Sequence, residues 1–297
     1  MVNHIQTNLV TSLKAVNDDG VLRVPLQGKG GISSLELTAK ATNGAGGSAS
    51  YGLLASITKV EIKTLHGQGI LDLSATEVYR IATLKRREAP QLSEGTGAGA
   101  VQIVKLPIDF GIRGSELYGL DLEKYPDCYL NVYYTLHINA GDGFATKTFE
   151  LDVDATQTQD LQQPFYQGRI GLAEAWNGTT QVQNPHRVEL KGTQNVTGIY
   201  LYAYKSGTAD NALVKNINLI AVPGHQKIIS ASFSDLQERR KPVGGSIVTS
   251  WLALWVAPGM FGERAIEPLK APEVEIELEE LVADGAAKIF LEELRQA

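Results

Sequence analysis

The chain has 297 residues, of which 43% are hydrophobic and 20% are charged, and its 27 basic and 33 acidic side chains give a net charge of -6. These proportions exclude overall disorder and provide apolar material for two domains of about 150 residues each. The acidic balance argues against general affinity for nucleic acid.

A single cysteine, Cys128, excludes an intrachain disulfide. The N-terminal segment lacks the apolar run of a signal peptide, and no segment approaches the ~20 apolar residues that cross a bilayer. We therefore expect a soluble protein that folds in a reducing compartment.

The first predicted elements are an N-terminal arm and two strands. Residues 1–18 mix polar and apolar side chains, which predicts an arm over Met1–Val16, a short helix or a loosely held terminus. Alternation of apolar and polar residues predicts strands at Val21–Leu26 and Ile32–Ala39. The glycine- and serine-rich segment Thr42–Ser50 predicts a loop.

The stretch Ile57–Arg87 predicts a strand, a glycine turn, a second strand at Ile70–Leu73 and a helix. The helix begins at Ser74, and an acid three residues later, Glu77, completes a capping box. Basic residues end the helix, where they suit the negative end of its dipole. They are Lys85, Arg86 and Arg87.

Three more strands and a tethered loop complete the first half. They are strands at Val101–Phe110, Tyr129–Ile138 and Thr146–Val153, and the loop Gly111–Pro126. Pro107 indicates a sheet edge or a bulge in its strand. The loop Ser93–Gly99 lacks the Gly-Lys-Ser/Thr ending of a phosphate-binding loop. The polar segment Asp154–Gly168 is interpreted as the connection between the halves.

The second half is predicted to contain six strands besides a repeat of the first-half block. The six are Ile170–Trp176, Arg187–Leu190, Gly198–Tyr204, Ile247–Val256, Val274–Leu281 and Lys288–Leu294. In Gly198–Tyr204, the tyrosines at 200, 202 and 204 are expected to share one face. Trp251 and Trp255 are expected in the core.

The segment Leu213–Pro242 repeats the order of parts found in Ile57–Arg87. Two strands again flank a glycine turn, a helix again begins at a capped serine, Ser232, with Asp235 three residues later, and basic residues end it. They are Arg239, Arg240 and Lys241. The shared order favours a duplication, with domains at residues 1–160 and 161–297.

No catalytic or metal-binding constellation stands out, so we expect neither an enzyme nor a cofactor. The five histidines lack the i, i+4 spacing of a zinc helix, and no Gly-x-Ser-x-Gly elbow occurs. His66 and His225 occupy equivalent turns of the two repeats. Asp142 and the pair Asp18–Asp19 could bind calcium in loops, but too few acids lie near them to support it.

The two basic clusters, Lys85–Arg87 and Arg239–Lys241, are the candidate site residues. One interpretation is that they are solvated helix ends. The other is that they contact the acidic face of a neighbouring subunit or bind anionic phosphates.

The strand-turn-strand-helix block at Val60–Arg86, its repeat at Ile217–Arg240 and the closing strand pair carry a family resemblance. The chain resembles the double jelly-roll major capsid proteins of icosahedral viruses with an internal membrane, most closely the corticovirus-like kind. The resemblance covers nearly the whole chain as architecture. It implies an all-β fold of two tandem jelly-roll β-barrels, each with a short helix.

The resemblance also implies a structural role in the virion. Three copies would form a pseudo-hexagonal capsomer, and capsomers would tile an icosahedral shell over an internal membrane. The expected partners are the chain itself as a homotrimer, neighbouring capsomers, penton or minor capsid proteins and the viral membrane, without specific nucleic-acid binding. Assembly is expected in the host cytoplasm, and the arm Met1–Val16 is expected to reach a neighbour or the membrane.

Three alternatives stay open. A carbohydrate-binding β-sandwich, such as a lectin or viral fibre-like protein, predicts an exposed aromatic platform. An enzyme on such a scaffold, such as a glycoside hydrolase, needs two carboxylates across a cleft. A minor capsid or cement protein would share the expected fold.

Overall fold

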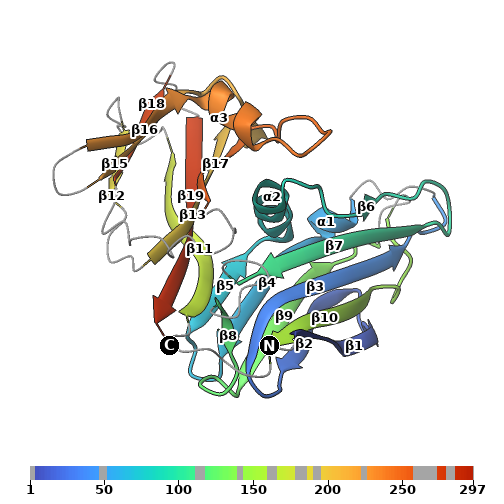
Figure 1. Cartoon of the computed structure of the whole chain (residues 1–297). Helices are drawn as coiled ribbons and strands as arrows, with labels where there is room; N and C mark the ends of the chain where they lie inside the picture. Colours follow the sequence, from blue (N-terminus) through green and yellow to red (C-terminus); the bar gives the residue numbers. More distant parts are fainter. Residues whose placement is uncertain are drawn as a thin grey trace. The chain divides into compact units, whose positions relative to one another are not determined.

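The computed structural model describes residues 4–46, 52–110, 118–138, 143–158, 166–177, 186–189, 195–221, 226–256, 273–278 and 285–296 (Figure 1). The chain forms two compact units. Unit 1 consists of Met1–Ala82, Ala89–Arg169 and Gln296–Ala297, and unit 2 consists of Thr83–Glu88 and Ile170–Arg295. The expected boundary between residues 160 and 161 lies outside the described residues.

Unit 1 is built from two antiparallel sheets. Its strands are β1 (His4–Lys14), β2 (Asp19–Leu26), β3 (Gly31–Thr42), β4 (Ile57–Thr64), β5 (Gly69–Leu73), β6 (Leu92–Ser93), β7 (Val101–Asp109), β8 (Tyr118–Asp121), β9 (Cys128–Thr135) and β10 (Glu150–Thr158). One sheet has the order β1-β10-β3-β7, and the other has the order β2-β9-β4-β5. The short helix α1 (Leu53–Ser56) precedes β4, and α2 (Ala75–Arg86) follows β5.

Alternation of side chains explains the strands of unit 1. In β3, Leu35, Leu37 and Ala39 are fully buried, whereas the residues between them are only half-buried. In β4 and β9, alternate apolar residues likewise face the interior, whereas polar residues lie on the other face. The buried faces of both sheets provide the apolar core of the unit.

Unit 2 repeats this arrangement. Its elements are β11 (Tyr166–Asn177), which begins in unit 1, β12 (His186–Glu189), β13 (Asn195–Lys205), β14 (Thr208–Ala209), β15 (Val214–Ala221), β16 (Gln226–Ser232), α3 (Phe233–Arg240), β17 (Trp251–Val256), β18 (Glu273–Leu278) and β19 (Gly285–Gln296). One sheet has the order β11-β19-β13-β17, and the other has the order β12-β18-β15-β16. Apolar residues of both sheets form one core cluster, which includes Ile199 and Leu201 from the first sheet and Ile217 and Ile276 from the second.

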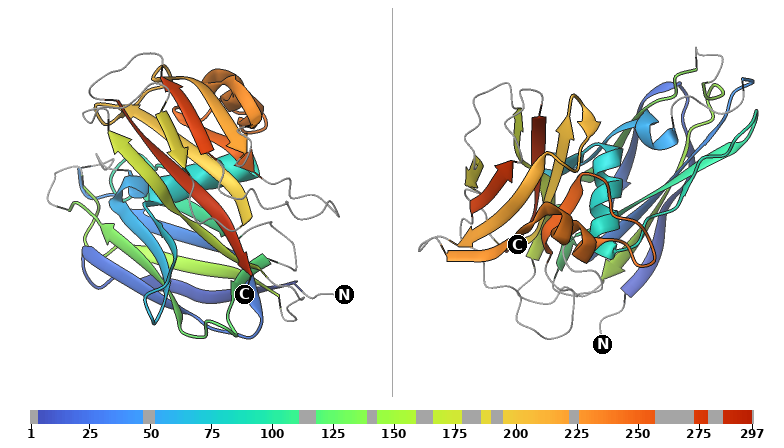
Figure 2. Two further views of the ribbon diagram at one scale, coloured as in Figure 1. Left: turned by 90° about the vertical axis from the view of Figure 1, so that its left-hand side faces the viewer. Right: turned by 90° about the horizontal axis from the view of Figure 1, so that it is seen from above.

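The two units share one topology. Taken in chain order, β1, β2, β3, β4, β5, β7, β9 and β10 correspond to β11, β12, β13, β15, β16, β17, β18 and β19. Each unit also has a helix between the fifth and sixth of these strands, and α3 packs against β15, β16 and β17 (Figure 2). Two packed sheets whose strands are connected in this order form a jelly roll. The expected all-β double jelly-roll fold, with a helix in each half, is confirmed.

Both predicted helix caps are confirmed. The Ser74 backbone N–H donates to Glu77 Oε2 at 2.9 Å, and the Glu77 N–H donates to Ser74 Oγ at 3.3 Å. In unit 2, the Asp235 N–H donates to Ser232 Oγ at 3.1 Å. These bonds satisfy amide groups that the first helical turn leaves unpaired.

The expectation for the N-terminal segment is wrong over residues 4–14. These residues form β1, which pairs antiparallel with β10, instead of an arm, a helix or a loose terminus. Two register shifts interrupt the pairing, and Ser12 has a positive φ of 49°. Irregular spacing at these bulges hides the alternation by which strands are identified in a sequence.

Other boundaries also differ from the expected ones. Residues 118–121 of the expected loop Gly111–Pro126 form β8, and β10 begins at Glu150 because Lys147 turns with a φ of 55°. In unit 2, β17 begins only at Trp251, because the Trp251 N–H closes a turn onto Val248 O at 3.1 Å.

The predicted edge position of Pro107 is confirmed. Pro107 lies on β7 and pairs with β3 on one side. On the other side of β7, the short strand β6 pairs only with Ile103 and Val104.

The capping box of α2 contributes to the stability of the protein. We expect Ser74→Ala to lower the free energy of unfolding by about 1 kcal/mol, because it leaves an amide of the first turn without its partner. Chemical denaturation measures this change. The matched control is Ser93→Ala in the exposed strand β6, and an equal effect of the two substitutions would contradict the role of the cap.

Candidate functional site

The structure places the two predicted basic clusters at the ends of α2 and α3. Lys85 is engaged inside unit 2: its Nζ lies 2.7 Å from Glu292 Oε1, and the Glu292 side chain is only 1% exposed. Tyr200 Oη donates to the other oxygen of Glu292 at 3.0 Å. Lys241 pairs with Glu238 at 2.6 Å within the same helix end.

The remaining residues of the clusters differ in exposure. Arg87 and Arg239 are exposed, whereas Arg86 and Arg240 are half-buried. Burial lowers the pKa of Arg240, and the positive charge of Arg87 lowers it further. The structure therefore brings Arg87, from the end of α2, close to Arg240, from the end of α3.

A second set of charged residues, which the sequence analysis did not identify, crosses the sheet β2-β9-β4-β5. Arg23, Asn131, Glu61 and Asp72 lie opposite one another on successive strands, and we call them row 1. Arg23 Nε donates to Asn131 Oδ1 at 3.0 Å, and Asn131 Nδ2 donates to Glu61 Oε2 at 3.0 Å.

Glu61 is the buried centre of row 1. Its exposure is 9%, yet it receives Lys59 Nζ at 3.1 Å, Lys63 Nζ at 2.9 Å and Tyr133 Oη at 3.2 Å. Burial opposes ionisation of this carboxyl, but the hydrogen bonds from Lys63, Lys59 and Asn131 outweigh it and lower the pKa of Glu61 to about 2. The carboxylate is ionised and fully occupied by its partners.

The sheet β12-β18-β15-β16 of unit 2 carries an equivalent set. Arg187, Glu275, Asn218 and Ser230 lie opposite one another on successive strands, and we call them row 2. Arg187 Nε donates to Glu275 Oε2 at 2.8 Å, and Asn218 Nδ2 donates to Glu275 Oε1 at 2.8 Å. Burial again opposes ionisation, but the hydrogen bonds from Asn218 and Arg187 lower the pKa of Glu275.

The two rows have the same arginine position but exchange the two central residues. In row 1 the carboxylate is on β4 and the amide on β9, whereas in row 2 the amide is on β15 and the carboxylate on β18. Each buried carboxylate is held ionised by an amide and by cations. Neither is in the protonated state that a general acid needs near neutral pH.

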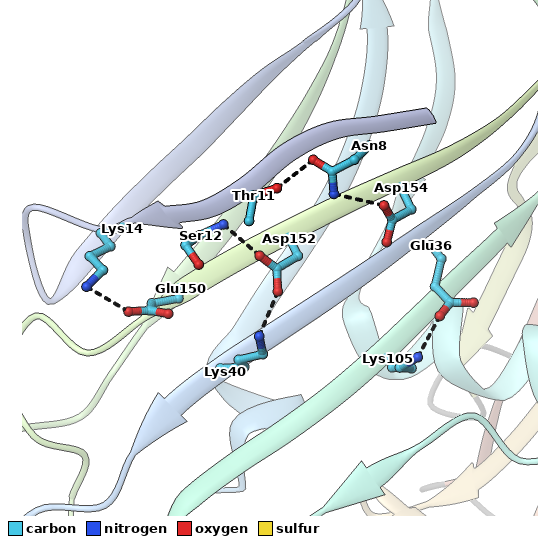
Figure 3. Close-up of polar contacts among 10 residues, drawn as sticks. All are labelled: Asn8, Thr11, Ser12, Lys14, Glu36, Lys40, Lys105, Glu150, Asp152 and Asp154. Carbon is cyan, nitrogen blue, oxygen red and sulfur yellow. Dashed lines mark hydrogen bonds and ion pairs between the residues drawn. The ribbon is translucent and has the colours of Figure 1, made fainter. Parts of the chain in front are cut away.

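The outer face of the other sheet of unit 1 carries a third polar set, shown in Figure 3. Asp152 on β10 is its centre, because it accepts the Ser12 backbone N–H at 2.6 Å and Lys40 Nζ at 2.7 Å. Asn8 donates to Asp154 at 2.9 Å, and Lys14 lies 3.1 Å from Glu150. These contacts hold the bulged edge strand β1 on β10.

The sequence analysis also considered His66, His225, Asp142 and Asp18. His66 is exposed in the turn between β4 and β5, and His225 and Asp142 lie outside the described residues. The Asp18 carboxylate accepts hydrogen bonds from Thr146 Oγ1 at 2.9 Å and from the Lys147 N–H at 2.7 Å. Within the described ranges, no group of three or more His, Cys, Asp or Glu side chains is placed to hold a metal.

Aromatic rings stack on the face of β13, β17 and β19 that is opposite the core cluster of unit 2. Trp251 is 3% exposed and stacks on Tyr202 and Phe290, with ring centroids 4.8 and 5.5 Å apart, so it is buried as predicted, although on the face opposite the core cluster. Tyr202 also stacks on Tyr204 at 5.0 Å, as expected for residues that share one face of β13. The Trp255 side chain lies outside the described residues.

Cys128 is buried in β9, and burial raises the pKa of its thiol to about 11, helped by the charge of Asp127. The thiol is therefore protonated at neutral pH and unreactive. No helix in the described part of the chain is both long and apolar enough to cross a membrane.

No protein-family model and no curated protein matches the sequence. Solved structures do match its fold. The chain is similar to the MCP of STIV, with a TM-score of 0.72, 10% identity and coverage of 99% of this chain and 97% of that one. It is also similar to the major capsid protein of bacteriophage PM2 (TM-score 0.62, 10% identity, 98% and 97% covered) and to the PBCV-1 virus capsid protein (0.60, 12%, 99% and 94%). These similarities confirm the expected resemblance to double jelly-roll major capsid proteins at the level of the fold.

The lowered pKa of Glu61 predicts a loss of stability in acid. Because the folded-state pKa is about 2 and the ordinary value is 4.5, its contribution is complete above pH 4.5 and is lost as the pH falls towards 2. We expect Glu61→Gln to lower the free energy of unfolding at pH 7 by about 1–3 kcal/mol and to flatten this acid dependence.

Denaturant titrations at several pH values measure both effects. The control is Glu36→Gln, which removes a partly exposed ion pair with Lys105 and is expected to change stability by less than about 1 kcal/mol. An unchanged acid profile in Glu61→Gln would contradict the assignment.

Proposed function

We propose that this chain is a structural capsid protein of a virus. The observation that carries the proposal is the double jelly roll itself, which aligns over 99% of this chain with 97% of the MCP of STIV. The two aligned chains therefore have nearly the same extent, and the alignment spans both units. The capsid fold supports a structural, non-enzymatic role in the virion.

The internal duplication supports a more specific proposal, that of a trimeric major capsid protein. Three copies around a threefold axis present six similar jelly rolls, which gives a block with a nearly hexagonal outline. Such blocks tile a shell with few kinds of contact. The equivalent topology of the two units, which extends to rows 1 and 2, supports this pseudo-sixfold arrangement.

We further propose its partners and location. The chain would contact its own copies within the trimer, neighbouring trimers in the shell, penton or minor capsid proteins and an internal membrane. Assembly would take place in the host cytoplasm. The structural neighbours support the self-assembly, and the membrane contact and cytoplasmic assembly rest on the family resemblance alone.

The carbohydrate-binding alternative loses part of its support. It predicts an exposed aromatic platform, whereas Trp251 is buried among Tyr202 and Phe290. The half-buried rings of Tyr202 and Tyr204 remain stacked on one another.

Light scattering on the purified protein, with negative-stain images of the same fraction, tests the proposal. We expect a mass of three times the 32.1 kDa chain and particles with a hexagonal outline. A chain that stays monomeric at high concentration would contradict the trimer. A glycan-binding screen of that monomer would then test the carbohydrate-binding alternative.

A further inference from the structure

The ends of α2 and α3 meet at one place in unit 2. Arg87 directly follows α2, and its carbonyl oxygen accepts the backbone N–H of Val243 at 2.9 Å. Val243 stands three residues after Arg240, the last residue of α3. Two basic clusters that are about 150 residues apart in the sequence therefore present one arginine each to a common surface.

Neither arginine has a carboxylate partner among the residues that the structure describes. Nearby cations do have one, since Lys85 pairs with Glu292 and Lys241 pairs with Glu238. Arg240 is half-buried beside a like charge, an arrangement that disfavours the charged state unless an anion approaches. Among the described residues, the pair is thus a positive site without a compensating carboxylate.

The backbone holds this site in a defined shape. Arg87 has a positive φ of 54° just after the helix, a conformation in which glycine is usually found. The segment that contacts Arg87 forms a tight turn. The Gly245 N–H closes this turn by donating to Pro242 O at 3.1 Å, and Gly244 allows it with a positive φ of 71°. The turn presents Val243 with 82% of its surface exposed.

The combination of charges and an apolar tip indicates the kind of partner. Guanidinium groups bind carboxylates through paired hydrogen bonds, and arginine is enriched at protein interfaces. A free anion would satisfy the arginines but would leave Val243 exposed, whereas a protein surface covers both. A second copy of this chain carries 33 acidic against 27 basic side chains and so offers a surplus of carboxylates.

We propose that Arg87, Arg240 and Val243 form a contact that receives a carboxylate-bearing surface of a second copy of this chain. The inference rests on the proposed function, because it assumes that the chain associates with itself. It adds the residues of one contact and the chemistry of what they bind.

The test compares Arg87→Gln/Arg240→Gln with the matched control Arg239→Gln, which removes an exposed arginine of the same helix end. Sedimentation velocity at low and high salt measures self-association, and circular dichroism confirms folding. We expect the double variant to associate about tenfold more weakly at low salt and to lose most of the salt dependence, with the control within about twofold of the wild type.

Equal association of the double variant and the control would overturn the inference while leaving the proposed function intact. A wild-type chain that never associates would instead contradict the proposed function. If the double variant fails to fold, Val243→Asp carries the test, because its side chain is exposed in a turn. It is expected to weaken association by repelling the incoming carboxylate, and unchanged association would overturn the contact.

Titration with inorganic phosphate separates the copy from a free anion. Wild-type protein that binds phosphate through both arginines, together with unchanged self-association of the double variant, would assign the site to a free anion and overturn the proposed occupant. Competition of phosphate with self-association would support the carboxylate contact.

Discussion

One sheet in each unit carries a buried carboxylate on a central strand, and neighbouring side chains must compensate its negative charge. Glu61 is 9% exposed and Glu275 is 5% exposed, and each is held by an asparagine on the neighbouring strand and by basic side chains. Loss of one partner would leave a charge or an amide unpaired in a poorly solvated place. A strand shifted by one residue would turn these partners to the other face, so the rows fix the register of four strands at once.

The same constraint connects the two halves of the chain. The arginine of each row lies on the outer strand, β2 or β12, while the carboxylate and the amide have changed places between the two central strands. A pair that works in either orientation can diverge in sequence and still preserve the geometry of the sheet. Two units of one topology agree with the proposed trimer, in which six similar jelly rolls would surround a threefold axis.

Much of this fold could be predicted from the sequence because its signals are local. Alternation identified β3 and β15, the spacing of Ser74 and Glu77 identified the start of α2, and the repeated order of parts identified the duplication. Bulges interrupt the alternation of β1, so this strand could not be identified from the sequence. Because of the turn at Val248, β17 begins later than the apolar run that contains it. These departures come from contacts with Asp152 and from a tight turn, neither of which leaves a periodic pattern.

The polar rows and the converging arginines are harder to predict from the sequence. Glu61 and Asn218 stand at outward positions of predicted strands, but only the strand pairing shows that their partners are Asn131 and Glu275. The basic helix ends were identified by their composition. Their separation into paired lysines and the converging arginines Arg87 and Arg240 depends on tertiary packing.

The central claim is that rows 1 and 2 stabilise their sheets in the same way, with the carboxylate and the amide on exchanged strands. A double-mutant cycle on row 1 tests this claim most directly. Glu61→Asn removes the carboxylate from Lys59 and Lys63, and Asn131→Glu places a second carboxylate beside Glu61, so each single change is expected to cost about 1–3 kcal/mol of unfolding free energy. The double variant recreates the arrangement of row 2, with a carboxylate opposite Arg23 as Glu275 is opposite Arg187. We expect denaturant titrations to show that the double variant is more stable than either single variant. A double variant whose loss equals the sum of the two single losses would contradict it.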